Sequence, residues 1–206
     1  MPILSTDAFT GTNGTALPTY APSRWMTSPG DSNLVIQTNT AGSGSGANSG
    51  AVNIEVVWPQ DHYTQATVVA ITDWTQLVTV RHSAVDHKTF YGAGHVNNDF
   101  GDKKYRIVKY VDTDFTPLAG VASQVMTIGD VVRLEIMQLE LVLYVNSIEV
   151  LRFTDGIEVL WTGNSGMYIA HPSSGLQIWD AYEAGTPDAG EPTNPSILSG
   201  NEKGWS

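Results

Sequence analysis

The sequence predicts an all-β protein built as a two-sheet antiparallel sandwich of the jelly-roll type. Three observations support this fold class. Apolar residues recur at every second position in many short segments, turn residues separate these segments by about 8 to 15 residues, and no segment shows the 3.6-residue period of an amphipathic helix. Charged residues make up only 15% of the chain, which also contains 20 glycines. This composition is typical of short strands joined by many turns.

The clearest segment is Asp130 to Asp155, DVVRLEIMQLELVLYVNSIEVLRFTD. Its apolar side chains occupy alternate positions, at Val132, Leu134 and Ile136 and then at Leu141, Leu143 and Val145. A period of two is typical of strands that bury one face. Gln138 to Glu140 and Asn146-Ser147 supply the reversals between strands. We therefore predict three antiparallel strands in a meander.

The other elements follow from the same period and from the turns between them. Phe9 is predicted to be a buried anchor, and Pro18 to Pro29 an extended rim segment rather than a helix. The glycine-rich stretch Ala41 to Gly50 is predicted to be a flexible loop, and Asp112 to Pro117 a turn. Strands are expected at residues 34–38, 52–58, 63–71, 77–81, 89–96, 105–111, 167–170 and 176–182.

The chain is predicted to form one jelly-roll domain, residues 1–184, followed by a Pro/Gly-rich C-terminal tail, residues 185–206. A length of 206 residues suits one sandwich. The tail, GTPDAGEPTNPSILSGNEKGWS, has no periodic apolar face. One interpretation is a disordered end. The other is a docking arm that contacts a partner through Ile197, Leu198 and Trp205.

Composition excludes several classes of function. Ten basic and twenty-one acidic residues give a net charge of −11, which repels phosphates, so nucleic acid is not expected as a partner. The absence of cysteine excludes disulfides and thiolate sites. The start MPILSTDAF lacks the features of a Sec-type signal, and no apolar run reaches the roughly 18 residues that a membrane span needs. We expect no membrane insertion.

Three parts of the sequence carry a family resemblance: DAFTGTNGTALPTYAPSRW, Gln65-Ala66-Thr67-Val68, and GDVVRLEI followed by LYVNSIEVLRFTDG. They resemble the laminin-G-like, concanavalin A-like jelly-roll domains, over residues 7–185. Such domains occur in virion proteins of tailed bacteriophages and in bacterial surface or carbohydrate-active proteins. The resemblance implies the fold more than a function, because this fold hosts lectins, hydrolases, lyases and assembly modules. The family's usual turn is Asn-Gly, whereas this chain has Asn146-Ser147.

A glycosidase of this fold requires two carboxylates about 5 to 9.5 Å apart across the scissile bond. The resembling glucanases place them on one strand as Glu-x-Asp-x-x-Glu or Glu-x-Asp-x-Glu, a run that this sequence lacks. Glu135 and Glu140 flank a turn, and Glu149 and Asp155 have apolar residues between them. We therefore expect no catalytic residues and no enzymatic activity.

The histidines allow a second kind of site to be considered. His82, His87 and His95 fall on adjacent predicted strands and loops, where they can bind a metal, act as acid and base, or simply lie at a sheet edge. Their spacing matches no metal motif, so we expect neither a metal site nor a cofactor. Because some resembling domains bind calcium, a calcium ion is an open alternative, with candidate ligands at Asp102, Asp112, Asp114 and Asp155.

Aromatic residues are the candidates for ligand binding. Lectin-type sites stack sugar rings on an exposed aromatic face and hold the hydroxyls with a few polar side chains. Core packing is the alternative, foremost for Tyr91 and Tyr168. The candidate set is Trp74, Arg81, Tyr91, Asn97, Asn98, Trp161 and Tyr168.

The leading hypothesis is a non-catalytic structural or adhesion protein of a phage virion, either a capsid decoration or cement protein or part of a tail fibre. Its expected partners are other virion subunits or further copies of itself in a homo-oligomer. The expected location is the virion, or else an extracellular or cell-surface site. The alternative is a carbohydrate-binding, lectin-like module that recognises surface glycans. A polysaccharide hydrolase or lyase is the third hypothesis.

Overall fold

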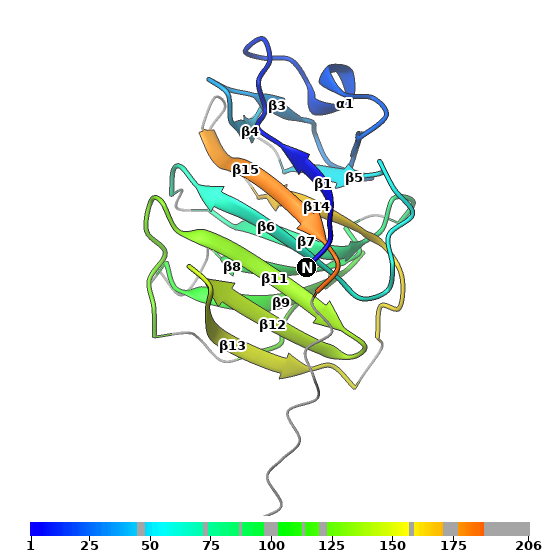
Figure 1. Ribbon diagram of the computed structural model, residues 1–206, viewed down its shortest axis with the longest axis vertical. Helices are drawn as coiled ribbons and strands as arrows, with labels where there is room; N and C mark the ends of the chain where they lie inside the picture. Colours follow the sequence, from blue (N-terminus) through cyan, green and yellow to red (C-terminus); the bar gives the residue numbers. More distant parts are fainter. Residues whose placement is uncertain are drawn as a thin grey trace, which may run out of the picture.

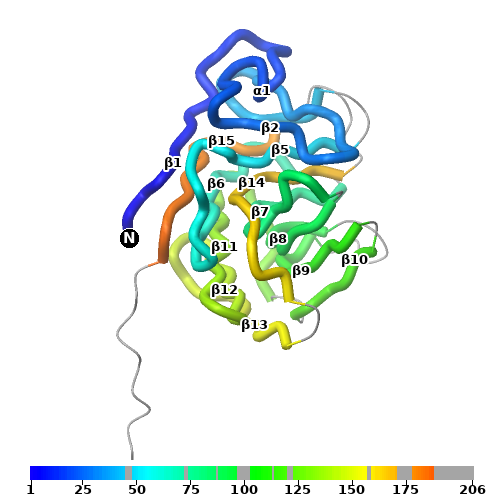
Figure 2. The backbone as a smooth tube through the Cα atoms, turned by 90° about the vertical axis from the view of Figure 1, so that its right-hand side faces the viewer, coloured from blue at the N-terminus to red at the C-terminus, as the bar shows by residue number. Residues whose placement is uncertain are grey.

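Two antiparallel β-sheets lie face to face in the computed structural model, with one sheet on each side of the edge-on view (Figures 1 and 2). The structure describes residues 1–44, 48–71, 74–86, 88–96, 103–112, 114–119, 123–156, 159–170 and 177–187, with the side chain of Gln177 left aside. The prediction of an all-β jelly-roll sandwich is confirmed.

The first sheet, named sheet A, contains the predicted meander. Its strands are β1 (Ile3–Asp7), β3 (Leu34–Ile36), β4 (Ala41–Ser43), β6 (His62–Val68), β11 (Val131–Met137), β12 (Glu140–Val145), β13 (Ile148–Thr154) and β15 (Gln177–Gly185). Their order is β13-β12-β11-β6-β15-β4-β3, and β1 pairs with β15 beside this path. The pairing of β1 with β15 brings the first and last of the described strands side by side (Figure 1).

The second sheet, named sheet B, covers the inner face of sheet A. Its strands are β2 (Trp25–Thr27), β5 (Ser49–Asn53), β7 (Gln76–His82), β8 (Phe90–His95), β9 (Tyr105–Val111), β10 (Asp114–Pro117) and β14 (Asn164–Ile169). Their order is β10-β9-β8-β7-β14-β5-β2. A short helix, α1 (Leu17–Tyr20), packs near β2 and β3.

The meander pairs as three antiparallel strands, as predicted. Leu134 on β11 pairs with Leu143 on β12, which pairs with Leu151 on β13. The turn between β12 and β13 consists of Asn146 and Ser147, whose φ angles are 53° and 66°. Positive φ at both central residues is what a type I′ hairpin turn requires. The prediction from alternating apolar residues is therefore confirmed in detail.

The core between the sheets combines apolar side chains with a chain of hydroxyl groups. Phe9, Trp25 and Trp179 are among its fully buried members. The Thr64 hydroxyl, on β6, donates to the carbonyl of residue 79 at 2.6 Å and also contacts Ser165 Oγ. Ser165 Oγ in turn lies 2.6 Å from the hydroxyl of Tyr182. These polar groups satisfy one another, so their burial leaves no hydrogen bond unmade.

Several local predictions were wrong. Asp112 to Pro117, predicted to be a turn, contains the strand β10, and the strand predicted at 52–58 is β5, which ends at Asn53. The stretch Ala41 to Gly50 does not form a single flexible loop, because β4 and the start of β5 lie in it and are buried. Strands of Gly, Ala and Ser show no apolar alternation, since they are buried by close backbone approach rather than by large side chains. Pro18 lies within α1, because the first turn of a helix tolerates the missing N–H of proline. No described helix is long and apolar enough to cross a membrane.

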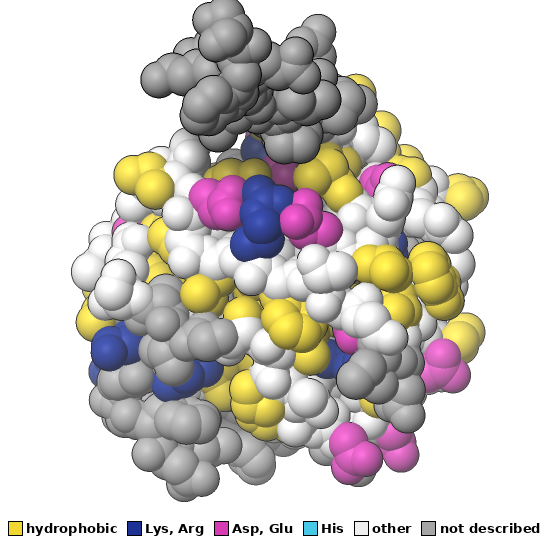
Figure 3. Space-filling view, turned by 90° about the horizontal axis from the view of Figure 1, so that it is seen from below, with side chains coloured by type: hydrophobic (Ala, Val, Ile, Leu, Met, Phe, Trp, Pro, Cys, Tyr) yellow, Lys and Arg dark blue, Asp and Glu magenta, His cyan; other side chains and the backbone are white. Residues whose placement is uncertain are grey.

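The edge strands carry charges and a proline. On β13, the strand at one edge of sheet A, Arg152 forms ion pairs with Glu140 and Glu149. The view from below shows a basic side chain flanked by acidic ones near the centre of that face (Figure 3). At the edge of sheet B, β10 begins with Asp114 and ends with Pro117. Charges and proline hinder edge-to-edge pairing with other strands.

Candidate functional site

A second cluster of buried apolar side chains lies on the outer face of sheet B. It consists of Leu77, Phe90, Val96, Val108 and Tyr168, with Tyr110, Phe115 and Ala170 packed against it. Because side chains alternate along a strand, these residues point away from the core that holds their neighbours Val78, Tyr91 and Ile107. Tyr110 and Phe115 at its margin are only half-buried, so this face is a candidate for ligand binding.

The aromatic rings of this cluster are in contact with one another. The ring centroid of Phe90 lies 5.0 Å from that of Tyr110 and 5.1 Å from that of Tyr168. Tyr110 lies 5.2 Å from Phe115 on the edge strand β10. Phe90 and Tyr168 are buried, whereas Tyr110 and Phe115 are half-buried. The result is an aromatic surface with a rigid floor and an accessible margin.

Two charged residues from turns lie beside the rings. Lys88 Nζ is 3.7 Å from Asp31 Oδ1, and the two side chains are 15% and 0% exposed. Burial, followed by the negative charge of Asp31, raises the pKa of Tyr110 to about 12. Burial and the nearby charges of Tyr110 and Asp31 also raise the pKa of Tyr168. Both phenols therefore stay protonated and keep a hydroxyl that can donate.

His82 lies at the inner margin of the cluster as a neutral imidazole. Its Nε2 is 3.0 Å from Ser28 Oγ, its Nδ1 is 2.9 Å from Thr79 Oγ1, and its ring centroid is 4.6 Å from that of Phe90. Burial lowers its pKa to about 3. Both ring nitrogens are engaged with protein hydroxyls, so His82 positions neighbouring groups instead of binding a metal.

The other candidates for metal binding do not gather. His95 is buried, and His87 lies outside the described residues. Among the calcium candidates, Asp155 is buried and bound to Lys109 and Tyr91, and Asp102 is not described. In the part of the chain that the structure describes, no three His, Asp or Glu side chains are close enough to hold a metal ion.

Two glycines allow these polar groups to lie against the sheet. A Cβ at Gly50, on β5, would lie 2.6 Å from the Cβ of Ser28 and 3.0 Å from Asp31 Oδ2. A Cβ at Gly166, on β14, would lie 2.9 Å from His82 Nδ1. Larger residues at these positions would therefore push the Ser28 to Asp31 segment or the imidazole off the sheet.

The central strands of sheet B place no carboxylate on this outer face. In β5, β7, β8, β9 and β14, all of which are described, no residue on the outward side of the register is acidic. The carboxylate of this face comes from Asp31, in the turn between β2 and β3. Glycoside hydrolysis by the usual routes needs two carboxylates facing each other, and these strands do not supply that pair.

The structure separates the ligand-binding residues that the sequence predicted. Tyr168 belongs to the outer cluster. Tyr91 lies on the inner face of β8, where its hydroxyl donates to Asp155 Oδ2 at 2.7 Å. Arg81 is buried, and its guanidinium donates to three backbone carbonyls. Arg81 and Tyr91 are therefore both buried, which agrees with the core-packing alternative for Tyr91.

Trp74 and Trp161 are exposed but far apart. Their exposed fractions are 39% and 54%. Trp74 lies two residues before the start of β7, whereas the residue before Trp161 contacts Arg81 near the end of the same strand. Seven strand residues span about 20 Å, so the two indoles lie at opposite ends of the sandwich. Asn97, Asn98 and the predicted arm residues Ile197, Leu198 and Trp205 lie outside the described residues.

Sequence reasoning missed most of the outer cluster. The alternation in Tyr105 to Val111 places Tyr110 and Val108 on one face, which is a usable signal for an aromatic strand face. Asp31 and Lys88 carry no such signal, because they come from two turns that only the tertiary structure brings together.

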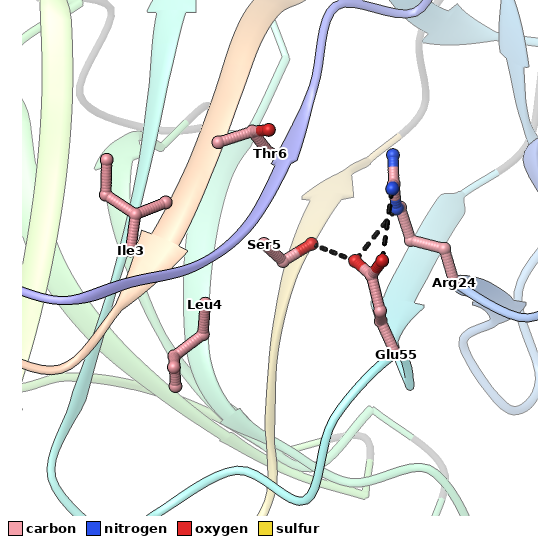
Figure 4. A pocket seen from close by; sticks show the side chains of 6 residues that line it. All are labelled: Ile3, Leu4, Ser5, Thr6, Arg24 and Glu55. Atoms are coloured by element: carbon pink, nitrogen blue, oxygen red, sulfur yellow. Dashed lines mark hydrogen bonds and ion pairs between the residues drawn. The ribbon is translucent and has the colours of Figure 1, made fainter.

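A polar hollow of about 230 Å³ lies at the edge of β1 (Figure 4). Its lining consists of Ile3, Leu4, Ser5, Thr6, Arg24 and Glu55. Arg24 donates to both carboxylate oxygens of Glu55 at 2.9 and 3.1 Å, and Ser5 donates to Glu55 at 2.6 Å. The hollow is smaller than the roughly 300 Å³ of most ligand pockets. Its charged groups already bind one another, so we favour the outer face of sheet B.

Comparisons with known proteins agree on the fold. No family model and no curated protein matches this chain in sequence. Among solved structures, the carbohydrate-binding module CBM66 from Bacillus subtilis is 15% identical with a TM-score of 0.52, covering 77% of this chain and 89% of that one. A Bacillus subtilis protein of unknown function with a galectin-like fold is 7% identical with a TM-score of 0.58, covering 90% and 96%.

An enzyme shares this architecture as well. A prokaryotic β-1,3-1,4-glucanase (lichenase) derived from a mouse hindgut metagenome is 9% identical with a TM-score of 0.54, and the match covers 89% of this chain and 99% of that one. At such low identities these likenesses establish the jelly-roll, galectin-like sandwich alone. They leave the function to be argued from the site.

Proposed function

We propose that this chain is a non-catalytic carbohydrate-binding domain that holds a glycan against the outer face of sheet B. The observation that carries the proposal is the aromatic cluster on that face, with Asp31 and Lys88 at its side. The likeness to a carbohydrate-binding module and to a galectin-like protein supports it through the fold. Because a glucanase shares that fold, the residues of the face decide between binding and cleavage.

The arrangement suits a sugar ring. The C–H groups of a pyranose or furanose pack on an aromatic face, and its hydroxyls need a few fixed donors and acceptors. Tyr110 and Phe115 offer accessible ring surface, while Phe90 and Tyr168 support them from below. Lys88, whose side chain is 15% exposed beside the buried Asp31 carboxylate, can donate hydrogen bonds to hydroxyl groups. The rings are held before the ligand arrives, which lowers the entropy cost of binding.

The proposal of binding without catalysis rests on the carboxylates. The outward side chains of the five central strands of sheet B are not acidic, and the Asp31 carboxylate lies beside a lysine. The Asp31 carboxylate is buried beside its cation, whereas glycoside hydrolysis needs an acid and a second carboxylate that both reach the substrate.

Binding measurements on matched variants test the proposed function. The full chain is titrated with a panel of soluble polysaccharides in affinity electrophoresis and calorimetry, alongside Tyr110→Ala, Phe115→Ala and the distant control Ile148→Ala. We expect Tyr110→Ala to weaken binding by about tenfold, or about 1.4 kcal/mol. The control should bind like the parent, because Ile148 is 68% exposed and begins β13 in sheet A, outside the cluster. Release of reducing ends, or parent and Tyr110→Ala binding equally, would contradict the proposal.

The resemblance to phage virion domains led to a further prediction, a structural role with other virion subunits or copies of the same chain as partners. This role stays a prediction and is compatible with glycan binding, since an adhesion protein of a virion or a cell surface meets glycans. We propose that the domain is located on the surface of a virion or of a cell. Light scattering for oligomeric state and detection of the protein in purified particles test the prediction.

A further inference from the structure

Trp161 is a large apolar side chain that stays more than half exposed on a rigidly held segment. It lies in the connection between β13 and β14 and is 54% exposed. The preceding residue, Leu160, is bonded on both backbone groups to buried side chains. Its N–H donates to the Tyr91 hydroxyl at 3.0 Å, and its carbonyl accepts from Arg81 Nη1 at 2.6 Å.

The segment is also fixed on its other side. At Gly163 φ is 146°, and a Cβ there would lie 2.3 Å from the carbonyl carbon of Arg81. The backbone around Trp161 is therefore held against β7 both before and after the indole. Scattered exposed hydrophobic residues are ordinary, but a tryptophan displayed on a pinned backbone has the preorganisation that binding sites require.

Arg81 draws two further loops to the same end of the sandwich. Its Nη2 donates to the carbonyl of Gln138 at 2.7 Å and its Nε to the carbonyl of Gln60 at 3.2 Å. Gln138 belongs to the turn between β11 and β12, and Gln60 to the connection before β6. One buried guanidinium thus holds three loops together, with Trp161 on one of them and exposed amide residues on the other two.

The charges at this end favour an uncharged ligand. The guanidinium of Arg81 is fully buried, and Asp61 beside it is 49% exposed. Among the described residues of the three loops, 54–61, 138–139 and 159–163, no lysine or other arginine occurs. An acidic polysaccharide would meet a carboxylate there without a matching cation.

We propose that the loop end around Trp161 is a second glycan contact, which packs the ring of a neutral sugar on the indole. The proposal rests on the carbohydrate-binding function proposed above and adds a contact on a different surface. The amide side chains of Gln60 and Gln138, together with Asp61, supply donors and acceptors for hydroxyl groups. A polysaccharide that reaches both surfaces gains avidity from the second contact.

The experiment compares variants at the two surfaces. The full chain, Trp161→Ala, Trp161→Phe, Tyr110→Ala and the control Ile148→Ala are titrated with laminarin, levan, mannan and mixed-linkage β-glucan, and with polygalacturonate as the acidic probe. We expect Trp161→Ala to lose about tenfold in affinity for the neutral polysaccharide that the parent binds. Trp161→Phe, which keeps a ring, should recover most of it. Ile148→Ala, at an exposed position on β13 of sheet A, should match the parent.

Comparing the variants distinguishes the second contact at Trp161 from the proposed glycan binding on which it rests. If Tyr110→Ala loses binding and Trp161→Ala does not, the second contact is overturned and the function stands. A parent that binds none of the polysaccharides overturns both. Preferential binding of polygalacturonate overturns the neutral ligand class. Because Trp161 is exposed, its variants should unfold within about 2 °C of the parent, so a loss of binding reports the surface and not the fold.

Discussion

Lys109 Nζ lies 3.0 Å from Asp155 Oδ2 in the interior of the sandwich, where the two side chains are 8% and 4% exposed. The Tyr91 hydroxyl donates to the same carboxylate oxygen at 2.7 Å. Lys109 and Tyr91 belong to sheet B, and Asp155 directly follows the last strand of the meander in sheet A. The buried ion pair therefore joins the two sheets at the lower end of the sandwich, near β13 in Figure 1.

This ion pair predicts a strong coupling between two substitutions. Lys109→Met alone should lower the free energy of unfolding by about 3 to 5 kcal/mol, because it leaves a buried carboxylate without its cation. The double variant Lys109→Met/Asp155→Leu should be more stable than the sum of the two single changes implies. Urea unfolding of the four proteins measures the coupling. Additive losses would show that the two groups do not interact.

Replacing Arg81 with lysine, the most conservative change, should destabilise the protein. Lysine cannot reach three carbonyls with a planar fork, so Arg81→Lys leaves backbone acceptors of the three loops unsatisfied. We expect a loss of about 2 to 4 kcal/mol in the free energy of unfolding. Arg152→Lys is the control, because Arg152 is 41% exposed and surface pairs contribute about 1 kcal/mol or less. Equal losses in the two variants would contradict the clamp at Arg81.

Two buried histidines predict how stability changes with pH. His62 Nδ1 donates to the Pro59 carbonyl at 2.8 Å and its Nε2 accepts from the Arg81 N–H at 3.1 Å. Burial lowers the pKa of His62 to about 4 and that of His82 to about 3. Unfolded histidine has a pKa of about 6.5. The unfolded chain therefore binds more protons than the folded chain below that pH.

The direction in which stability changes with pH follows from this difference in bound protons. Stability is complete above about pH 6.5 and falls as the pH falls toward 4, by up to about 1.4 kcal/mol per pH unit for each histidine. Urea unfolding between pH 7.5 and 5 measures the slope. A His62→Gln variant, less stable at neutral pH, should lose about half of this pH dependence. A flat profile in the parent would contradict the neutral buried imidazoles.

The turn at Asn146 and Ser147 predicts a stabilising substitution. Ser147 has a φ of 66°, which is strained for a residue with a Cβ. Ser147→Gly should raise the free energy of unfolding by about 0.5 to 1 kcal/mol, after the larger backbone entropy of glycine in the unfolded chain is subtracted. Thermal unfolding measures the gain.

Asn146→Gly is the contrasting variant for that turn. The Asn146 side chain accepts from the Val131 N–H at 2.9 Å and donates to Asp130 at 2.8 Å. Glycine would remove both hydrogen bonds, so this variant should be less stable than the parent by about 1 to 2 kcal/mol. A gain from both glycine variants would mean that the asparagine contacts contribute nothing.

Local patterns predicted the sandwich because the strands that build it alternate visibly. The meander from Val131 to Thr154 and the strand Tyr105–Val111 have the expected bounds. Alternation failed where a strand is buried through small residues, as in Ala41–Ser43 and the start of Ser49–Asn53. There the backbone is buried by close approach to neighbours, which leaves no apolar period in the sequence.

By itself, the sequence determined that this chain folds as an antiparallel sandwich, because a period of two depends only on neighbours along the strand. The tertiary structure alone decided which face of each strand points inward and which residues meet. Tyr91 lies in the core and Tyr110 on the outer face. Asp31 and Lys88, from two separate turns, form an ion pair. Contacts between distant segments depend on how the whole sheet pairs and twists, and no local pattern records them.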